Sequence, residues 1–264
     1  MRQPHRPSTY PRLSRRAIVA GAVLLALILV ALAVMVDRVA AARVEARTAE
    51  AFQDGMDTAQ RPAVHVRGFP VLTQLADGTL RHVDITAHDI PAQGADRPLP
   101  VTDLSVRLDD VRRSDDDHEA HARSAEAVAH LSYTDVSDAL GLEISRGVRP
   151  GEVRAAVLLP LGDQVTVTTS VSVAAGNRIA FNDFRVTGGS LPAVGEELLT
   201  KAFEEPLQLR NIPTGLHLRT ITTTATGLDA RFTGSSVTFR PDGADEAEPA
   251  QPSAAGVAAP SPAP

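Results

Sequence analysis

The feature that most limits how this chain can fold is an apolar run close to its start. Residues 17–36 read AIVAGAVLLALILVALAVMV and contain no charged or strongly polar side chain. As a helix, these 20 residues span about 30 Å, which is the thickness of the hydrocarbon core of a bilayer. A soluble domain of this size has no place to bury such a helix. The sequence therefore predicts a single transmembrane anchor over residues 17–36.

The charges before this run predict its orientation. Residues 1–16 hold five arginines and no acidic residue, so they are expected to remain cytoplasmic, with everything after the run outside the membrane. A cleaved signal peptide is the alternative, because Ala40-Ala41-Ala42 offers a small-residue cleavage site, and the protein would then be secreted after cleavage following Ala42. The apolar run is longer than the roughly 7–15 residues typical of signal peptides, which favours the anchor.

The composition of the rest of the chain excludes several classes of function. Beyond residue 36 there are 21 basic and 32 acidic residues, so the exported part should be repelled by nucleic acid. The absence of cysteine excludes thiol nucleophiles, cysteine-ligated zinc and iron–sulfur clusters. Aromatic residues make up only 3%, so the core must be built from aliphatic side chains.

The exported part divides into three segments. Residues 37–60 have apolar residues at helical spacing and predict a connecting helix, either a plain spacer or a helix that packs on the domain. Residues 61–240 predict a β-rich domain, and residues 241–264 a disordered, acidic tail rich in proline and alanine.

Within 61–240, apolar and polar residues alternate over several stretches, as in antiparallel strands with one wet face. The clearest alternation covers residues 165–173, and a bulge is expected at Asn182-Asp183. Two helices are expected, at 134–140 and 193–203. The pattern predicts an α+β fold that is mostly antiparallel β.

Clusters of possible catalytic or metal-binding residues are better explained as exposed polar side chains than as reactive or metal-binding sites. His118 and His121 are three residues apart in an acidic stretch, whereas zinc proteases need a spacing of four on a helix. His82, Asp84 and His88 share one strand face that is expected to be exposed. Nucleophile elbows, phosphate loops and dinucleotide fingerprints are absent from the sequence. We therefore expect no enzyme activity, no metal and no cofactor.

The valines of the clearest strand leave two interpretations open. Val165, Val167, Val171 and Val173 share one face and could line a groove for acyl chains beside helix 193–203. They could equally pack into a solid core. Periodicity alone does not distinguish the two.

Three sequence segments resemble a known family. They are Val66-Arg67-Gly68-Phe69-Pro70-Val71-Leu72-Thr73-Gln74, then Leu131-Ser132-Tyr133-Thr134-Asp135-Val136, and finally Leu209-Arg210-Asn211-Ile212-Pro213-Thr214-Gly215-Leu216. In this order they resemble the LmeA-like phospholipid-binding family of actinobacterial cell envelopes. The resemblance runs from about Asp37 to Arg240, and Val71 stands where a second aromatic residue is common.

The resemblance implies a strongly curved sheet wrapped on a helix, related to tubular lipid-binding proteins. It also implies a non-enzymatic, membrane-tethered phospholipid-binding or lipid-transfer protein whose partners are acyl chains and the cytoplasmic membrane. The alternatives are an interaction domain without a lipid ligand and an accessory factor in envelope glycolipid assembly. Phe69 and Leu72 are expected to point inward. The candidate lipid-binding residues are Phe69, Leu72, Val165, Val167, Val171, Val173, Phe181, Phe184, Leu198, Leu199, Phe203 and Leu216.

Overall fold

The apolar run and the predicted connecting helix form one continuous helix, α1 (Arg15–Met56), of 42 residues. The side chains from Val19 to Val36 are all exposed, as expected of a helix that faces lipid. From Asp37 onward the pattern changes, because Asp37, Ala41 and Ala49 are buried and join the core of the domain. The second half of α1 therefore packs on the domain and is not a plain spacer.

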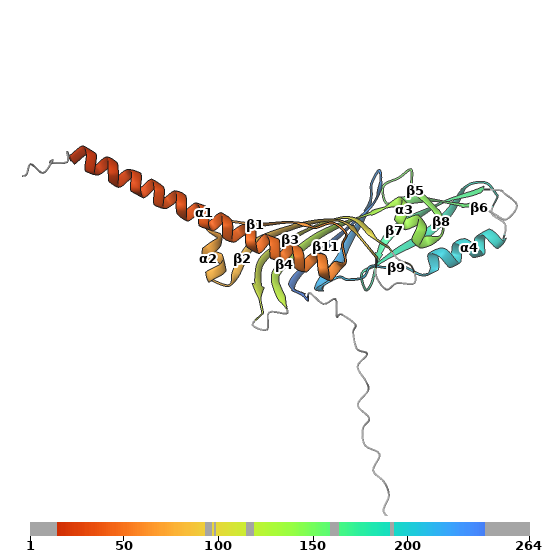
Figure 1. The fold of residues 1–264 in the computed structure, drawn as a ribbon. Coiled ribbons are helices and arrows are strands. Elements are labelled where there is room, and N and C mark those ends of the chain that lie inside the picture. Colours follow the sequence, from red (N-terminus) through yellow and green to blue (C-terminus); the bar gives the residue numbers. More distant parts are fainter. Residues whose placement is uncertain are drawn as a thin grey trace, which may run out of the picture.

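The computed structural model describes residues 15–92, 97, 99–114, 119–158, 164–190 and 193–240. The predicted tail at 241–264 and nearly all of the predicted cytoplasmic segment lie outside the described residues. Figure 1 shows α1 continuing into an elongated body, in which two antiparallel sheets follow one another along the direction of the helix. The predicted α+β fold is confirmed.

The first sheet has six strands in the order β1-β2-β3-β4-β11-β10 and is strongly curled (Figure 1). Its strands are β1 (Ala63–Arg67), β2 (Thr79–Ile90), β3 (Val101–Arg113), β4 (Ala120–Ser132), β10 (Thr214–Thr223) and β11 (Gly227–Phe239). The second half of α1 lies along β1. A short helix, α2 (Val71–Ala76), connects β1 to β2.

One face of this sheet is apolar across all six strands, as the alternating pattern requires. The register places Val64, Ile85, Val106, Ala127, Phe232 and Leu218 side by side. The middle of the central strand β4 contributes small residues to this face, namely Ala125, Ala127 and Ala129. Small side chains take little room on the inner side of a bend, so an alanine-rich central strand favours the curl.

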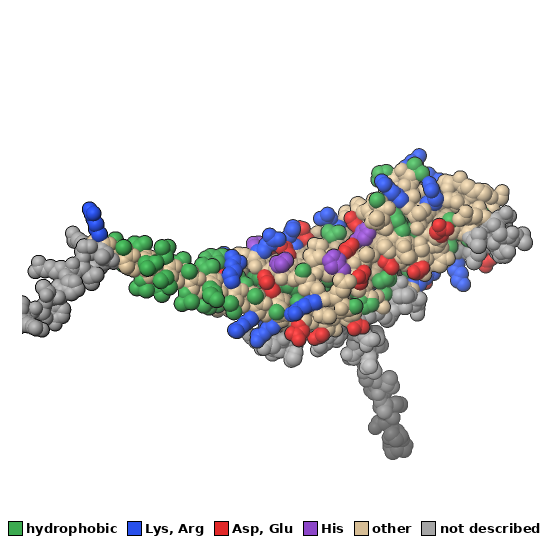
Figure 2. All heavy atoms as spheres, turned by 45° about the horizontal axis from the view of Figure 1, so that its top comes forward, with side chains coloured by type: hydrophobic (Ala, Val, Ile, Leu, Met, Phe, Trp, Pro, Cys, Tyr) green, Lys and Arg blue, Asp and Glu red, His purple; other side chains and the backbone are tan. Residues whose placement is uncertain are grey.

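The opposite face carries charged and polar side chains in matching cross-strand positions. His88, Asp103, His130 and Asp229 alternate across four neighbouring strands. The Nδ1 atom of His88 lies 2.5 Å from Asp103 Oδ1, and that of His130 lies 2.6 Å from Asp229 Oδ1. Hydrogen-bonded side chains placed directly across a strand pair stabilise the register. Figure 2 shows histidines between acidic and basic side chains on this surface.

The second sheet has five strands in the order β5-β6-β7-β8-β9. They are β5 (Glu143–Arg146), β6 (Glu152–Leu158), β7 (Gln164–Ala174), β8 (Arg178–Gly188) and β9 (Leu207–Gln208). The register between β7 and β8 shifts near Asp183, which has a φ of 54°, so the predicted bulge is confirmed. Both predicted helices are present, as α3 (Tyr133–Leu140) and α4 (Ala193–Glu204).

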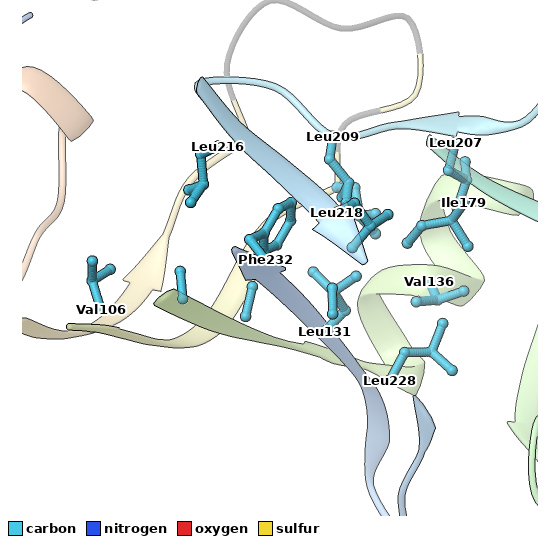
Figure 3. Close-up of a cluster of buried hydrophobic side chains, with 14 of the residues drawn as sticks. Val106, Leu131, Val136, Ile179, Leu207, Leu209, Leu216, Leu218, Leu228 and Phe232 are labelled. Carbon is cyan, nitrogen blue, oxygen red and sulfur yellow. The ribbon is translucent and has the colours of Figure 1, made fainter. Parts of the chain in front are cut away.

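The two sheets share one continuous core at their junction. Figure 3 shows Leu131, Leu218 and Phe232 of the six-stranded sheet gathered with Ile179 and Leu207 of the five-stranded sheet. The side chain of Asn177 adds a polar connection, because its Oδ1 accepts from Leu218 N at 2.8 Å and its Nδ2 donates to Leu216 O at 3.4 Å. The described body is therefore one folding unit. We call its end at α2, which adjoins the apolar run predicted to be an anchor, the membrane end, and its end at α4 the far end.

The outer face generates a prediction about pH. Hydrogen bonds from His82, at 2.7 Å, and from Ser124, at 2.9 Å, hold the pKa of Asp109 below its ordinary value of 3.8. A lowered carboxyl pKa means that the stabilisation is present above about pH 4 and is lost as the pH falls through the lower, folded-state value. We expect Asp109→Asn to lower the free energy of unfolding by about 0.2–1 kcal/mol at pH 6, the range for exposed pairs.

The difference between Asp109→Asn and the unmodified protein should be smaller at pH 3 than at pH 6, because at pH 3 the carboxyl group of Asp109 is mostly protonated in the unfolded chain. Chemical denaturation in detergent micelles, followed by far-UV circular dichroism at both pH values, measures it. Equal free energies of unfolding for Asp109→Asn and the unmodified protein at pH 6 would show that the His82–Asp109 pair does not stabilise the fold.

Candidate functional site

The twelve predicted lipid-binding residues fall in three separate places. Phe69 and Leu72 lie at the membrane end, beside α1 and α2 (Figure 1). The residues of 165–203 belong to β7, β8 and α4 at the far end. Leu216 lies on β10, at the junction of the two sheets (Figure 3). The structure does not bring them together into one pocket.

At the membrane end, the string from Gly68 to Gln74 forms a tightly fixed turn. Gly68 has a φ of +98°, and a Cβ atom at this position would lie 2.8 Å from Gln74 Nε2, so only glycine fits. The buried amide of Gln74 donates to Arg67 O at 3.4 Å and accepts from Arg81 N at 2.9 Å. Gln74 therefore ties the end of β1 to the start of β2 and needs no ligand to explain its burial.

The same turn directs Phe69 and Leu72 outward, which corrects the expected inward orientation. Helix α2 buries Val71 completely, together with Gln74 three residues later. Leu72 and Leu75 lie on the opposite side of the helix and are 40% and 39% exposed, while Phe69 is 55% exposed. Because the segment is helical rather than extended, Leu72 does not share the inward face of its neighbours.

A carboxylate from α1 fixes the position of α2. Asp37 is 2% exposed, and its Oδ1 accepts a hydrogen bond from Leu72 N at 2.8 Å. The N-cap residue of α2 is Pro70, which has no side-chain acceptor, so Asp37 supplies the missing cap from 35 residues earlier in the chain. The Oδ2 atom of Asp37 is buried and has no hydrogen-bond partner.

A second contact joins α1 to the edge of the six-stranded sheet. Glu45 Oε1 accepts from the backbone N–H of Val66 at 2.9 Å, on the open edge of β1. Asp37 and Glu45 are eight residues apart, about 12 Å along the helix axis. These two hydrogen bonds to one rigid helix fix both the position of the domain along the α1 axis and its rotation about that axis.

At the far end, the predicted residues form a densely packed cluster. Val165, Val167 and Leu199 are fully buried. Phe203 of α4 lies between two rings of β8, with centroid distances of 5.5 Å to Phe181 and 6.4 Å to Phe184. Strand β7 leaves this cluster towards its C-terminal end, since Val171 is half-buried and Val173 is 38% exposed. The side chain of Leu198 lies outside the described residues.

Helix α4 is held at its C-terminal end by an arginine from a distant loop. The Nη1 atom of Arg97 donates to Ala202 O at 3.1 Å and to Glu205 O at 3.4 Å. These contacts satisfy carbonyl groups that the end of a helix leaves without partners. Sequence reasoning did not find Arg97, because nothing in its local pattern indicates a contact more than 100 residues away.

The polar residues considered for chemistry are paired with their neighbours. Asp84 lies between Arg67 and Arg107, His82 contacts Asp109, and His88 contacts Asp103. Within the described residues, His, Asp and Glu side chains do not gather in threes as a metal site would require. His118 lies outside these residues, and His121 Nδ1 contacts Thr238 Oγ1 at 3.0 Å.

Two surface hollows adjoin these elements. One of about 580 Å³ lies beside the polar face of α4, near Glu196, Glu197 and Lys201. The other, of about 400 Å³, lies where β2, β3 and α3 meet, near Thr102 and Asp135. The fully buried valines and leucine of the far-end cluster line neither hollow.

The comparison with protein families gives a clear result. The model of the LmeA-like phospholipid-binding family matches residues 35–233. The chain belongs to this family. Curated proteins and solved structures gave no match. The LmeA-like region begins at the end of the apolar run and includes the packed half of α1, the Asp37–Leu72 contact and both sheets.

The contact between α1 and α2 generates a second prediction. We expect Asp37→Ala to lower the free energy of unfolding by about 1–2 kcal/mol, because the N-terminus of α2 loses its only side-chain cap. Asp37→Asn should cost less than Asp37→Ala, because its amide oxygen can still accept from Leu72 N.

Chemical denaturation in detergent micelles compares the two variants, and trypsin cleavage after Arg67 and Arg81 reports release of α2. Equal stability of Asp37→Ala and the unmodified protein would refute the capping role.

Proposed function

We propose that this chain is a membrane-tethered phospholipid-binding protein whose domain lies outside the cytoplasmic membrane and transfers lipid without catalysing a reaction. Its family membership supports the phospholipid ligand. The tether rests on α1, the one described helix that is long and apolar enough to cross a membrane. The extracytoplasmic side follows from the arginines before the helix.

The observation that carries this proposal is the unbroken passage of α1 from the apolar run into the core. A helix with no break at Asp37 holds the membrane end of the domain against the bilayer. The second half of α1, from Asp37 to Met56, extends about 30 Å from that point. The far-end cluster lies towards the other end of the body (Figure 1). A lipid bound there has left the bilayer, as transfer requires.

We place the acyl chain between α4 and the sheet, where Val165, Val167, Phe181, Leu199 and Phe203 meet. This cluster, together with Phe184, holds three of the seven phenylalanines of the chain. A lipid would have to replace the contacts that α4 makes there.

The magnitudes allow this exchange. Separating three large side chains costs roughly 5–9 kcal/mol, whereas burying a 16-carbon chain gains on the order of 13 kcal/mol relative to water, so a lipid that has displaced α4 is held against loss into water. The attachment of α4 through Arg97 leaves its C-terminal end in place while the helix moves from β8.

The buried polar side chains support a role without catalysis. Those of the described residues are Asp37, Thr58, Gln74 and Thr169. Asp37 and Gln74 bind backbone groups of the α2 turn, and Thr169 Oγ1 donates to Asn182 O at 2.7 Å. Each of these three is therefore used to hold the fold.

The orientation can be tested by reporter fusions. A reporter that is active only outside the cytoplasm should be active when fused after Arg240 and inactive when fused before Arg12, since the positive N-terminal segment stays inside. Western blots of both fusions control for expression. The reverse pattern of activity would overturn the proposed orientation.

The acyl site can be tested with a photoactivatable phospholipid in vesicles that contain the full chain. We expect cross-links to α1 in every variant and, in the unmodified protein, additional cross-links within 164–204. Val167→Phe should abolish the additional cross-links, because the ring fills the space beneath α4. The matched control is Val173→Phe on the same strand, which starts from a 38% exposed valine and should keep them.

Thermal unfolding of both valine variants separates blocked binding from misfolding, since overpacking costs about 1–3 kcal/mol. Cross-links confined to α1 and the α2 turn in the unmodified protein would refute the acyl site and favour an interaction domain without a lipid ligand.

A further inference from the structure

We propose that α2 and the preceding Phe69 form a second membrane contact, which rests in the boundary between headgroups and acyl chains of the bilayer that α1 crosses. We call Phe69, Leu72 and Leu75 the α2 surface. The inference rests on the proposed membrane tether. It goes beyond the proposed lipid binding, because the α2 surface would contact the bilayer whether or not a lipid enters the domain.

The first argument is the distribution of exposed apolar side chains. Among the described residues outside the apolar run, the large apolar side chains that are more than a third exposed are Val39, Phe69, Leu72, Leu75, Val148, Val173 and Val186. Three of these seven form the α2 surface, and a fourth, Val39, lies two residues beyond the Asp37 contact. Four of these seven side chains therefore lie at the membrane end of the body.

The second argument is the position of α2 along the axis of α1. Asp37 is the first residue after the 20-residue apolar run, so it lies where the hydrocarbon core ends. Its 2.8 Å hydrogen bond to Leu72 N places the start of α2 at that same level. The position of the α2 surface therefore follows from the position of the anchor.

The third argument is the charge around the α2 surface. Arg38 on α1 and Arg81 at the start of β2 are exposed near the α2 surface, while Arg67 at the end of β1 is exposed but pairs with Asp84. Figure 2 shows basic side chains where the apolar part of α1 meets the body. Arginines with long apolar stems suit a boundary between acyl chains and phosphate groups. Asp77, at the end of α2, is the acidic residue that faces solvent there.

The size of the α2 surface favours a bilayer over a protein partner. A specific protein interface buries about 800 Å² on each side and uses about 20–30 residues. Three side chains on a six-residue helix are far below that size. They suffice for a membrane contact, because α1 already holds them at the bilayer and no independent affinity is needed.

The absence of tryptophan makes a direct test possible, since one introduced indole gives the only tryptophan signal. Phe69→Trp and Leu72→Trp are reconstituted as full chains in phosphatidylcholine–phosphatidylglycerol vesicles, with and without brominated acyl chains. We expect the brominated lipids to quench both indoles at least twofold. The matched control is Val148→Trp, 82% exposed in the β5–β6 turn of the far sheet, which should be quenched little or not at all.

Two results would overturn the inference. One is quenching of Phe69→Trp and Leu72→Trp no greater than that of Val148→Trp, in vesicles that carry the protein on flotation. The other is fluorescence of Leu72→Trp that is blue-shifted but not quenched by the brominated lipids. That result would mean that another protein surface, and not the bilayer, covers α2. Flotation separates these results from a failed tether, in which no variant floats with the vesicles.

Discussion

On the proposed tether, helix α1 has to lie in lipid along its first half and against the domain along its second half, with one unbroken backbone. The rest of the structure depends on this constraint. Within a bilayer every backbone polar group must be bonded internally, so the helix cannot break inside the hydrocarbon core. It also does not break beyond it, because its second half buries Ala41 and Ala49 against the domain. The change of solvent occurs at Asp37, whose carboxylate faces α2 and not the lipid. The domain is thereby attached to the anchor through a rigid rod.

Much of the fold could be predicted because most strands have one solvent-exposed face, so that apolar and polar residues alternate along the sequence. The alternation of Val165 and Val167 with threonines indicated a strand, and the slip in the pattern at Asn182-Asp183 indicated the bulge that the positive φ of Asp183 produces. The helix predicted at 193–203 is present as α4, and Leu199 and Ala202, three residues apart, are both buried as one face of a helix requires. The sequence strings that resemble the LmeA-like family gave the correct family assignment.

The orientation of Phe69 and Leu72 could not be predicted, for a physical reason. Six residues make less than two turns, which is too short for a helical periodicity to show in the sequence. The residue that caps this helix lies 35 positions earlier, and local capping rules do not reach that far. A usable signal was nevertheless present. Asp37 is a lone acidic residue directly after the apolar run, where a carboxylate needs a specific partner to be buried.

The division of the candidate site into three places also depends on long-range pairing that no local pattern contains. Leu216 lies opposite Gly234 at the junction because β10 pairs with β11, whereas Phe203 meets Phe181 because α4 folds back on β8. The core between these places consists mainly of alanine, valine and leucine, with few rings. Each such side chain contributes only a modest free energy of burial, so a region of this core can exchange its contacts at limited cost. A soft aliphatic interior, which the proposed tether would hold beside a bilayer, is physically suited to exchanging its own side-chain contacts for those of an acyl chain.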